Sequence, residues 1–499
     1  MTAAPTRSTV RKSLEPWIYD SVEYFPWQID GIRDLCRRSS FLLADEMGLG
    51  KSLQALTVFA VDVALGKAQS AIVVAPATLK DNWADEIEKF TRFKYLVFGQ
   101  IVNPKTGKIA TLGPEARSLQ LTEFMLMDGP KILITNYEQI KPHLRMLNAA
   151  KFDVAIFDEA HYIKNYKAAR TKASIALITR RNFILTGSPM LNQVNELWTL
   201  LHKIDPGRFP RYWSFVQRYA VFGGYKDKAI IGVKNEKELN GIVNQYMVRR
   251  LAIDHLGLDT PQIIPRIVSL HPEQRKLYDE VYEDMRLTTT DDVLDIQNAL
   301  TKFLRLKQIC GTTATVLGPE IDHSYKLDLA IADDIDLIRM GLKIVVFTQF
   351  RGVQEAYVRR LVEACVAAGM PTPIFELNGD VKVTHRVPLV HDWENAKDAA
   401  VIVCMLQVAG VGLNMTAAHH CSFLDKLFVP KLNEQAIGRL HRIGQRFPVQ
   451  VREYRVKGTV ETRIEQILRT KHGLFRNVIE SGDYRTLLAL AMRAEAEDD

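Results

Sequence analysis

Two series of short, almost uninterrupted apolar runs restrict the fold of this chain more than any other feature of its sequence. The first series comprises five runs: FLLAD (41–45), AIVVAP (71–76), KILITN (131–136), DVAIFDEA (153–160) and NFILTGS (182–188). The second series comprises four runs: KIVVFTQF (343–350), AAVIVCML (399–406), HHCSFLD (419–425) and VQVREYRV (449–456). Such runs of Val, Ile and Leu are typical of strands buried on both faces, as in parallel sheets covered by helices. The two series therefore predict an α/β protein with two lobes.

The segment between the two series, residues 200–325, has a different character. It is rich in helix-forming and aromatic residues, and glycine and proline interrupt it, for example at Pro206-Gly207 and Gly223-Gly224. These residues mark turns between elements. We therefore expect helical insertions and a connection between the lobes in this segment.

The composition agrees with a soluble globular protein of two or three domains. The chain has 499 residues, of which 25% are charged and 47% hydrophobic, and its formal net charge of +7 permits a polyanionic partner without requiring one. The five cysteines are scattered without metal-type spacing, which favours a reducing compartment. The N-terminal segment lacks an apolar signal core, and we find no apolar run long enough to cross a bilayer. We therefore expect an intracellular protein.

A phosphate-binding loop is predicted within residues 41–56, FLLADEMGLGKSLQAL, where a strand, a glycine-containing turn and a helix follow one another. Gly48 and Gly50 leave room for backbone amides to point at phosphate oxygens, and the start of the helix adds partial positive charge. Lys51 is placed to reach the β- and γ-phosphates of ATP, and Ser52 to ligate Mg²⁺. One position departs from the general pattern, because Asp45 stands where the first glycine belongs.

An acidic pair follows another predicted strand in AIFDEAH, residues 155–161. A phosphate loop needs a carboxylate at a strand end to hold Mg²⁺, which predicts that role for Asp158. Glu159 is placed to orient or deprotonate an attacking water. The alternative is the capped start of a helix with a solvated acidic pair.

Two arginines lie close together late in the chain, in QAIGRLHRIGQ (435–445). Arg439 and Arg442 are three residues apart and would share one face of a helix. They are either an ordinary basic surface or a charge clamp that the second lobe brings to the γ-phosphate held by the first.

In chain order, these motifs resemble the Swi/Snf-type branch of the superfamily-two helicases. The DEMGLGKS loop (45–52), with aspartate in place of the first glycine, is the form that this branch carries, and it is followed by Asp158-Glu159-Ala160-His161, Thr186-Gly187-Ser188-Pro189 and the Gln435 to Arg442 motif. Further matching stretches are FPWQIDG (25–31), PATLKDNW (76–83), TNYEQI (135–140), LTGSPMLNQVNELW (185–198), FTQF (347–350), GVGLNMTAA (410–418) and HRIGQ (441–445). The resemblance extends from Phe25 to Ile467. The chain departs from the family pattern at Ala252, at Ala409 and at Phe428-Val429-Pro430.

The resemblance implies two tandem RecA-like lobes with parallel sheets flanked by helices, and helical insertions between them. On this basis we expect a flexible segment over 1–20 and a first, ATP-binding lobe over 21–265 with an insertion near 206–255. We expect a second lobe over 266–475 with an insertion near 272–320, then a C-terminal helix and acidic tail over 476–499. The two lobes take up the chain, so we expect a compact member without accessory domains.

The resemblance also implies roles for individual residues. In the ATP site, Gln28 contacts adenine, and the other binding positions are Gly48, Gly50, Lys51, Ser52, Gly412 and Gln435. The catalytic group comprises Lys51, Asp158, Glu159, Arg439 and Arg442, with Ser52 and Asp158 as ligands to Mg²⁺. A DNA-backbone track, which positions a duplex without reading its sequence, comprises Lys80, Asn82, Trp83, Tyr137, Gln349 and Arg351. Trp83 is equally suited to the protein core.

The predicted function is a DNA-stimulated ATPase that moves along double-stranded DNA and remodels protein–DNA or branched DNA structures. ATP and Mg²⁺ are the expected cofactors, and double-stranded DNA and proteins bound to it are the expected partners of a monomer. We expect an intracellular, DNA-associated location in a bacterial or virus-infected cell, or in a nucleus. The alternatives are a strand-separating DNA or RNA helicase, a catalytically dead DNA-binding scaffold, and the motor subunit of a defence or restriction complex.

Overall fold

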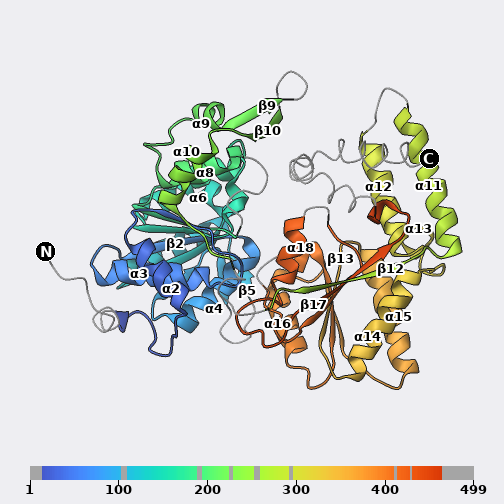
Figure 1. The fold of residues 1–499 in the computed structure, drawn as a ribbon. Coiled ribbons are helices and arrows are strands. Elements are labelled where there is room, and N and C mark those ends of the chain that lie inside the picture. Colours follow the sequence, from blue (N-terminus) through green and yellow to red (C-terminus); the bar gives the residue numbers. More distant parts are fainter. Residues whose placement is uncertain are drawn as a thin grey trace. The chain divides into compact units, whose positions relative to one another are not determined.

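The computed structural model describes residues 14–102, 109–187, 194–223, 229–251, 259–290, 296–409, 413–427 and 430–462. The chain divides into two compact units, residues 1–256 and 257–499. Figure 1 shows the strands of each unit gathered into a sheet with helices packed around it. Within the described ranges, no helix combines the length and the apolar character that a membrane span requires.

The first unit contains helices and strands in regular alternation through most of its length. Its elements are α2 (Pro26–Cys36), β1 (Phe41–Leu43), α3 (Lys51–Ala64), β2 (Ser70–Ala75), the 3₁₀ helix η1 (Ala77–Leu79), α4 (Lys80–Phe90), β3 (Lys94–Val97), β4 (Gln100–Val102), β5 (Ile109–Thr111), α5 (Pro114–Leu126), β6 (Lys131–Asn136), α6 (Tyr137–Ala149), β7 (Val154–Phe157), the 3₁₀ helix η2 (Ala160–Ile163), α7 (Ala169–Ala176), β8 (Arg181–Leu185), α8 (Val194–Ile204), α9 (Tyr212–Tyr219), β9 (Ala220–Gly223), β10 (Ala229–Val233), α10 (Glu236–Tyr246) and β11 (Met247–Val248).

The main sheet of the first unit has seven strands in the order β11-β1-β8-β7-β2-β6-β3. Every pair in it is parallel. The five strands at its centre are the five predicted apolar runs, and their residues are almost all buried because helices cover both faces. In a parallel sheet the carboxyl ends of all strands meet at one edge. The segments that follow β1, β2, β6 and β7 are therefore brought together there.

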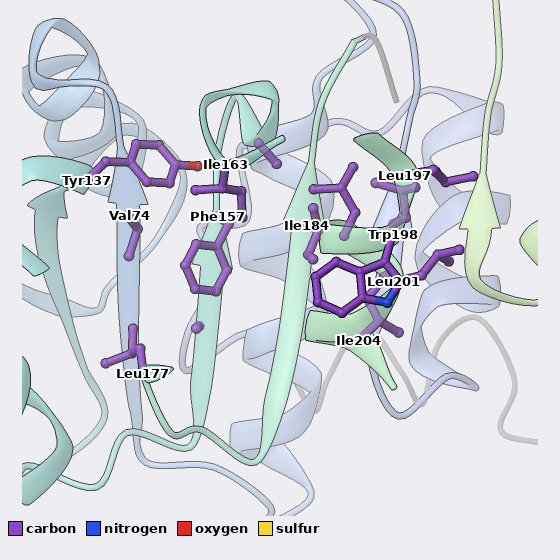
Figure 2. Close-up of a cluster of buried hydrophobic side chains, with 14 of the residues drawn as sticks. Val74, Tyr137, Phe157, Ile163, Leu177, Ile184, Leu197, Trp198, Leu201 and Ile204 are labelled. Carbon is purple, nitrogen blue, oxygen red and sulfur yellow. The ribbon is translucent and has the colours of Figure 1, made fainter. Parts of the chain in front are cut away.

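Apolar side chains from one face of this sheet pack against helices α6, α7 and α8. Figure 2 shows Trp198, Leu201 and Ile204 of α8 packed against Ile184 of β8, while Phe157 of β7 lies between Ile184 and Val74 of β2. Alternate residues of each strand enter this cluster, as the two-residue period of a strand requires.

The region predicted as a helical insertion near 206–255 contains α9 and α10. It also contains the antiparallel pair β9–β10, which the sequence reading did not predict. A second short antiparallel pair joins β4 and β5.

The second unit has the same kind of architecture. Its elements are β12 (Gln262–Val268), α11 (Pro272–Thr290), α12 (Ile296–Gly311), α13 (Ala314–Leu317), α14 (Tyr325–Arg339), β13 (Ile344–Thr348), α15 (Arg351–Ala367), β14 (Ile374–Leu377), α16 (Val383–Glu394), β15 (Val401–Met405), α17 (Leu406–Ala409), β16 (His420–Phe423), α18 (Pro430–Ile437) and β17 (Gln450–Val456).

The sheet of the second unit has six strands in the order β12-β17-β16-β13-β15-β14, all parallel. One face packs against α14 and α15, and the other packs against α16 and α18. The four predicted runs of the second series are confirmed as β13, β15, β16 and β17. The edge strand β12 runs through the expected boundary at residues 265 and 266. The two parallel α/β units confirm the predicted fold class of two RecA-like lobes.

Candidate active site

The phosphate loop occupies the turn between β1 and α3. Gly48 has φ 84° and Gly50 has φ 74°, a left-handed conformation in which a side chain would be strained. Helix α3 begins at Lys51, so its free amides and partial positive charge face the turn. The Lys51 amine donates to the carbonyl oxygens of Asp45 at 2.9 Å and Glu46 at 3.2 Å. The local structure therefore has the strand, turn and helix that a phosphate cradle needs, with Ser52 in the first turn of the helix.

Gln28 packs directly onto this loop. Its side chain is buried, and its amide donates to the carbonyl of Leu49 at 3.2 Å while its oxygen accepts from the amide of Phe25 at 3.0 Å. A Cβ atom on Gly50 would lie only 2.3 Å from the Gln28 amide nitrogen. The absence of a side chain at Gly50 is thus needed for this contact, which ties the upstream FPWQIDG element to the loop.

Asp45, at the position of the missing glycine, is a buried anchor for the loop. Its side chain is 0% exposed, and one carboxylate oxygen lies 3.0 Å from the Arg250 guanidinium and accepts from the Gln54 amide at 3.0 Å. Burial raises the pKa of Asp45, and the Arg250 charge opposes this shift. The sequence reading missed Arg250 because it lies 205 residues from Asp45, just beyond the short edge strand β11.

Asp158 and Glu159 follow β7 at the same edge of the sheet. The Glu159 amide donates to Asp158 Oδ1 at 2.8 Å, and Glu159 itself has φ 47°. This left-handed conformation is costly for a residue with a side chain and is often found at functional sites. The Glu159 side chain is only 17% exposed, and its Oε2 lies 3.1 Å from His161 Nδ1. A solvated acidic pair does not describe this arrangement.

The electrostatics of Asp158 suit a carboxylate that takes up a cation. Burial and the neighbouring Glu159 charge raise the pKa of Asp158 to about 6, while a hydrogen bond from Trp83 and the charge of Lys51 act in the opposite direction. The described residues contain no cluster of three or more acidic, His or Cys side chains suited to a metal. A phosphate-loop site needs no such cluster, because nucleotide oxygens, one hydroxyl and one carboxylate hold Mg²⁺. Ser52 and Asp158 therefore fit this ion.

Trp83 and Tyr137, predicted to contact DNA, contact Asp158 instead. Trp83 is 2% exposed and its indole donates to Asp158 Oδ2 at 2.9 Å. Tyr137 is 0% exposed and its hydroxyl donates to the backbone oxygen of Asp158 at 2.6 Å. Side chains buried to this degree offer no surface to a duplex, so the structure removes both from the proposed DNA track.

The other predicted DNA contacts differ in their exposure. Lys80 is largely buried, and this burial lowers the pKa of its amine. Gln349 is also buried, and it donates to the carbonyl of Lys426 at 3.3 Å. Asn82 is half-buried, whereas Arg351 is exposed and forms ion pairs with Glu355 and Asp380. Asn82 and Arg351 are therefore the two candidates with accessible surface.

In the second unit, the predicted helix does not reach the two arginines. Helix α18 ends at Ile437, and Arg439 and Arg442 lie in the turns that follow it. The amide of Arg439 donates to the carbonyl of Ala436 and that of Arg442 to the carbonyl of Leu440, so the helical hydrogen-bond pattern does not continue beyond α18. The prediction of one shared helical face is therefore wrong. Arg439 and Gln435 are buried, and Arg442 is half-buried.

Gln445, from the HRIGQ motif, holds these turns in place. Its amide donates to the carbonyl oxygens of Ala418 at 2.8 Å and Leu440 at 3.2 Å, and its oxygen accepts from two following backbone amides. The predicted positions Gly412, Ser188, Pro189 and Ala252 lie outside the described residues.

Two family profiles match the chain. The SNF2-related domain matches residues 26–314, and the helicase conserved C-terminal domain matches residues 329–444. The match with the SNF2-related domain covers more than half of the chain and includes the phosphate loop and the acidic pair.

Curated relatives match over most of this chain. The DNA annealing helicase and endonuclease ZRANB3 of Mus musculus is 27% identical over 467 residues, which are 89% of this chain and 40% of the relative. An uncharacterized ATP-dependent helicase of Mycoplasma pneumoniae is 28% identical over 87% of this chain and 39% of the relative. The SWI/SNF-related matrix-associated actin-dependent regulator of chromatin subfamily A-like protein 1 of Drosophila melanogaster is 26% identical over 95% of this chain and 58% of the relative. The chain thus spans about two fifths of the first two relatives.

Among solved structures, the Sulfolobus solfataricus SWI2/SNF2 ATPase core in complex with dsDNA covers 93% of this chain and 94% of its own, at 26% identity. The TM-score of this match is 0.41.

Proposed function

Because the chain belongs to the SNF2-related family of ATP-hydrolysing enzymes, we propose that it couples ATP hydrolysis to movement along double-stranded DNA. The observation that carries this proposal is the edge of the first sheet, where the phosphate loop and Asp158-Glu159 follow strands of one parallel sheet. A relative named as a DNA annealing helicase supports DNA as the nucleic acid. Remodelling of protein–DNA or branched DNA structures is the outcome we propose for this movement.

The nucleotide site of the first unit is proposed as follows. The amides at the start of α3 and the amine of Lys51 bind the phosphates, and Gln28 contacts the adenine beside the loop. Ser52 and Asp158 hold Mg²⁺, which when bound neutralises phosphate charge. Glu159, next to Asp158 in a strained backbone conformation, orients the attacking water.

The second unit is proposed to supply Arg442 to the γ-phosphate, with Gln435 and Gly412 as further contacts. Support for Arg442 comes from its partial exposure, since Arg439 is buried. We propose that Arg439 shapes the turn that presents Arg442, rather than reaching the phosphate itself. An arginine in this role stabilises charge that spreads over the transferred phosphoryl group.

The test is the rate of phosphate release by the full chain, measured with duplex DNA, single-stranded DNA, branched DNA and RNA. We expect duplex DNA to raise the rate more than RNA does, and Lys51→Ala to abolish hydrolysis with every nucleic acid. Stimulation by RNA alone, or by single strands alone, would support a strand-separating helicase instead. Absence of hydrolysis in the wild-type chain under all conditions would support a non-catalytic scaffold.

A further inference from the structure

Three strand ends meet around Asp158 in the first unit. Asp158 follows β7, whose neighbour in the sheet is β2, and β6 is the next strand beyond β2. After β2 the chain forms η1 and then α4, which carries Trp83, whereas α6 begins with Tyr137 directly after β6. Trp83 and Tyr137 therefore reach Asp158 from two different helices.

Each of the three oxygen atoms of Asp158 accepts a hydrogen bond from a neighbouring group. Its Oδ2 accepts from the Trp83 indole at 2.9 Å, its Oδ1 accepts from the Glu159 amide at 2.8 Å, and its backbone oxygen accepts from the Tyr137 hydroxyl at 2.6 Å. These bonds fix the plane of the carboxylate and the position of the backbone that carries it. A carboxylate oxygen that accepts one hydrogen bond keeps a further lone pair for a cation.

Both donors are themselves held rigidly. Trp83 and Tyr137 are buried, and the Tyr137 ring stacks on Tyr162 with centroids 5.6 Å apart and planes 10° apart. Figure 2 shows the Tyr137 ring at the end of the strand that carries Val74, with its hydroxyl directed toward Ile163. Side chains locked in this way cannot turn aside without moving the helices to which they belong.

We infer that Trp83 and Tyr137 are positioning residues for Asp158, and that Trp83 transmits the binding of a duplex on α4 to the hydrolysis site. The second part rests on the proposed function. Helix α4 begins at Lys80 and holds Asn82, which is partly accessible, next to the inward-facing Trp83. A duplex that shifts α4 moves the indole donor, and with it the orientation of the Asp158 carboxylate toward Mg²⁺.

The first experiment measures cation binding without turnover. Mn²⁺ replaces Mg²⁺ and is titrated in the presence of ADP by electron paramagnetic resonance, using the full chain. Trp83→Phe keeps an aromatic ring but removes the donor, so we expect Mn²⁺ binding to weaken by roughly 10- to 100-fold, as is usual for residues that orient metal ligands. An unchanged Mn²⁺ affinity would overturn the positioning role.

Trp198→Phe is the matched control. Trp198 is also a buried tryptophan of the first unit, and its indole donates to the carbonyl of Phe209 at 3.2 Å, away from Asp158. We expect this variant to lose thermal stability but to keep wild-type Mn²⁺ affinity. An equal loss of Mn²⁺ affinity in both variants would show a general packing effect and overturn the inference. If Trp83→Phe does not fold, Tyr137→Phe, which removes one hydroxyl only, gives the same test.

The second experiment measures coupling to DNA. In Trp83→Phe, we expect duplex affinity to stay within about twofold of wild type, while kcat/KM for ATP falls by roughly 10- to 100-fold and duplex no longer raises kcat. Unchanged duplex stimulation would overturn transmission through Trp83. If the wild-type chain itself is not stimulated by duplex, the proposed function fails, while the Mn²⁺ titration still decides whether Trp83 positions Asp158.

Discussion

Replacing Arg250 with methionine tests whether Asp45 is the anchor of the phosphate loop. Asp45 is 0% exposed and the Arg250 side chain is 13% exposed, with 3.0 Å between the paired atoms. In Arg250→Met, Asp45 keeps the Gln54 amide as a neutral donor but loses its countercharge. A charge left buried without its partner typically destabilises a protein by about 3–5 kcal/mol.

The same geometry predicts how this loss depends on pH. Burial already raises the pKa of Asp45, and removal of Arg250 raises it further. A carboxyl whose folded-state pKa lies above its unfolded value contributes stability at low pH and loses it as the pH rises through the folded pKa. The variant should therefore be closest to wild type in stability at acid pH, where Asp45 is protonated, and furthest from it at the high-pH end of the titration, where the stranded carboxylate is charged.

Urea unfolding of wild type, Arg250→Met, Asp45→Asn and the double variant measures the coupling. With Asp45 replaced by neutral asparagine, we expect Arg250→Met to lower the free energy of unfolding by about 1 kcal/mol or less, because no buried carboxylate is then left without its partner. The coupling between the two sites should thus be about 2–4 kcal/mol. The anchor role would be refuted if Arg250→Met alone lowered the free energy of unfolding by less than about 1 kcal/mol. It would also be refuted if Arg250→Met lowered the free energy of unfolding equally in the wild-type and the Asp45→Asn backgrounds.

Three further predictions concern the nucleotide site. Lys51→Ala should abolish ATP hydrolysis, yet the variant should unfold within a few degrees of wild type in calorimetry, because the Lys51 amine donates to loop carbonyls rather than packing in the core. Arg442→Lys should lower the single-turnover rate by a factor of roughly 10³–10⁵ while keeping ATP affinity, since lysine lacks the planar guanidinium. Near-normal hydrolysis would show that Arg442 is an ordinary surface residue. At subsaturating Mg²⁺, hydrolysis should fall as the pH drops through about 6, because protonated Asp158 offers no charge to a cation; an unchanged rate from pH 7.5 to 5.5 would contradict this.

The parts of the structure that depend on local patterns could be predicted from the sequence. The central strands of both sheets are short continuous apolar runs, and the strand–turn–helix order around Gly50 predicted the phosphate loop. The edge strands were missed. Strand β12 contains Pro265, which usually argues against a strand, but an edge strand has one side without ladder partners and tolerates it.

Contacts between residues far apart in the sequence could not be predicted. Nothing local marks Arg250 as the partner of Asp45, since the contact exists only when the short strand β11 joins β1. The sequence allowed Trp83 to be a core residue, but neither its segment nor that of Tyr137 marks a contact with Asp158, and the family resemblance pointed to DNA. The prediction of a helix through Arg439 was wrong because a spacing of three residues fits a turn as well as a helix. Gly438 follows the last residue of α18, so the helix ends before either arginine.

The measurement that tests the central claim most directly is displacement of the third strand from a DNA triplex by the full chain. We predict ATP-dependent displacement by the wild-type chain, no displacement by Lys51→Ala, and no separation of the strands of a plain duplex under the same conditions. Separation of duplex strands without triplex displacement would contradict movement along intact double-stranded DNA.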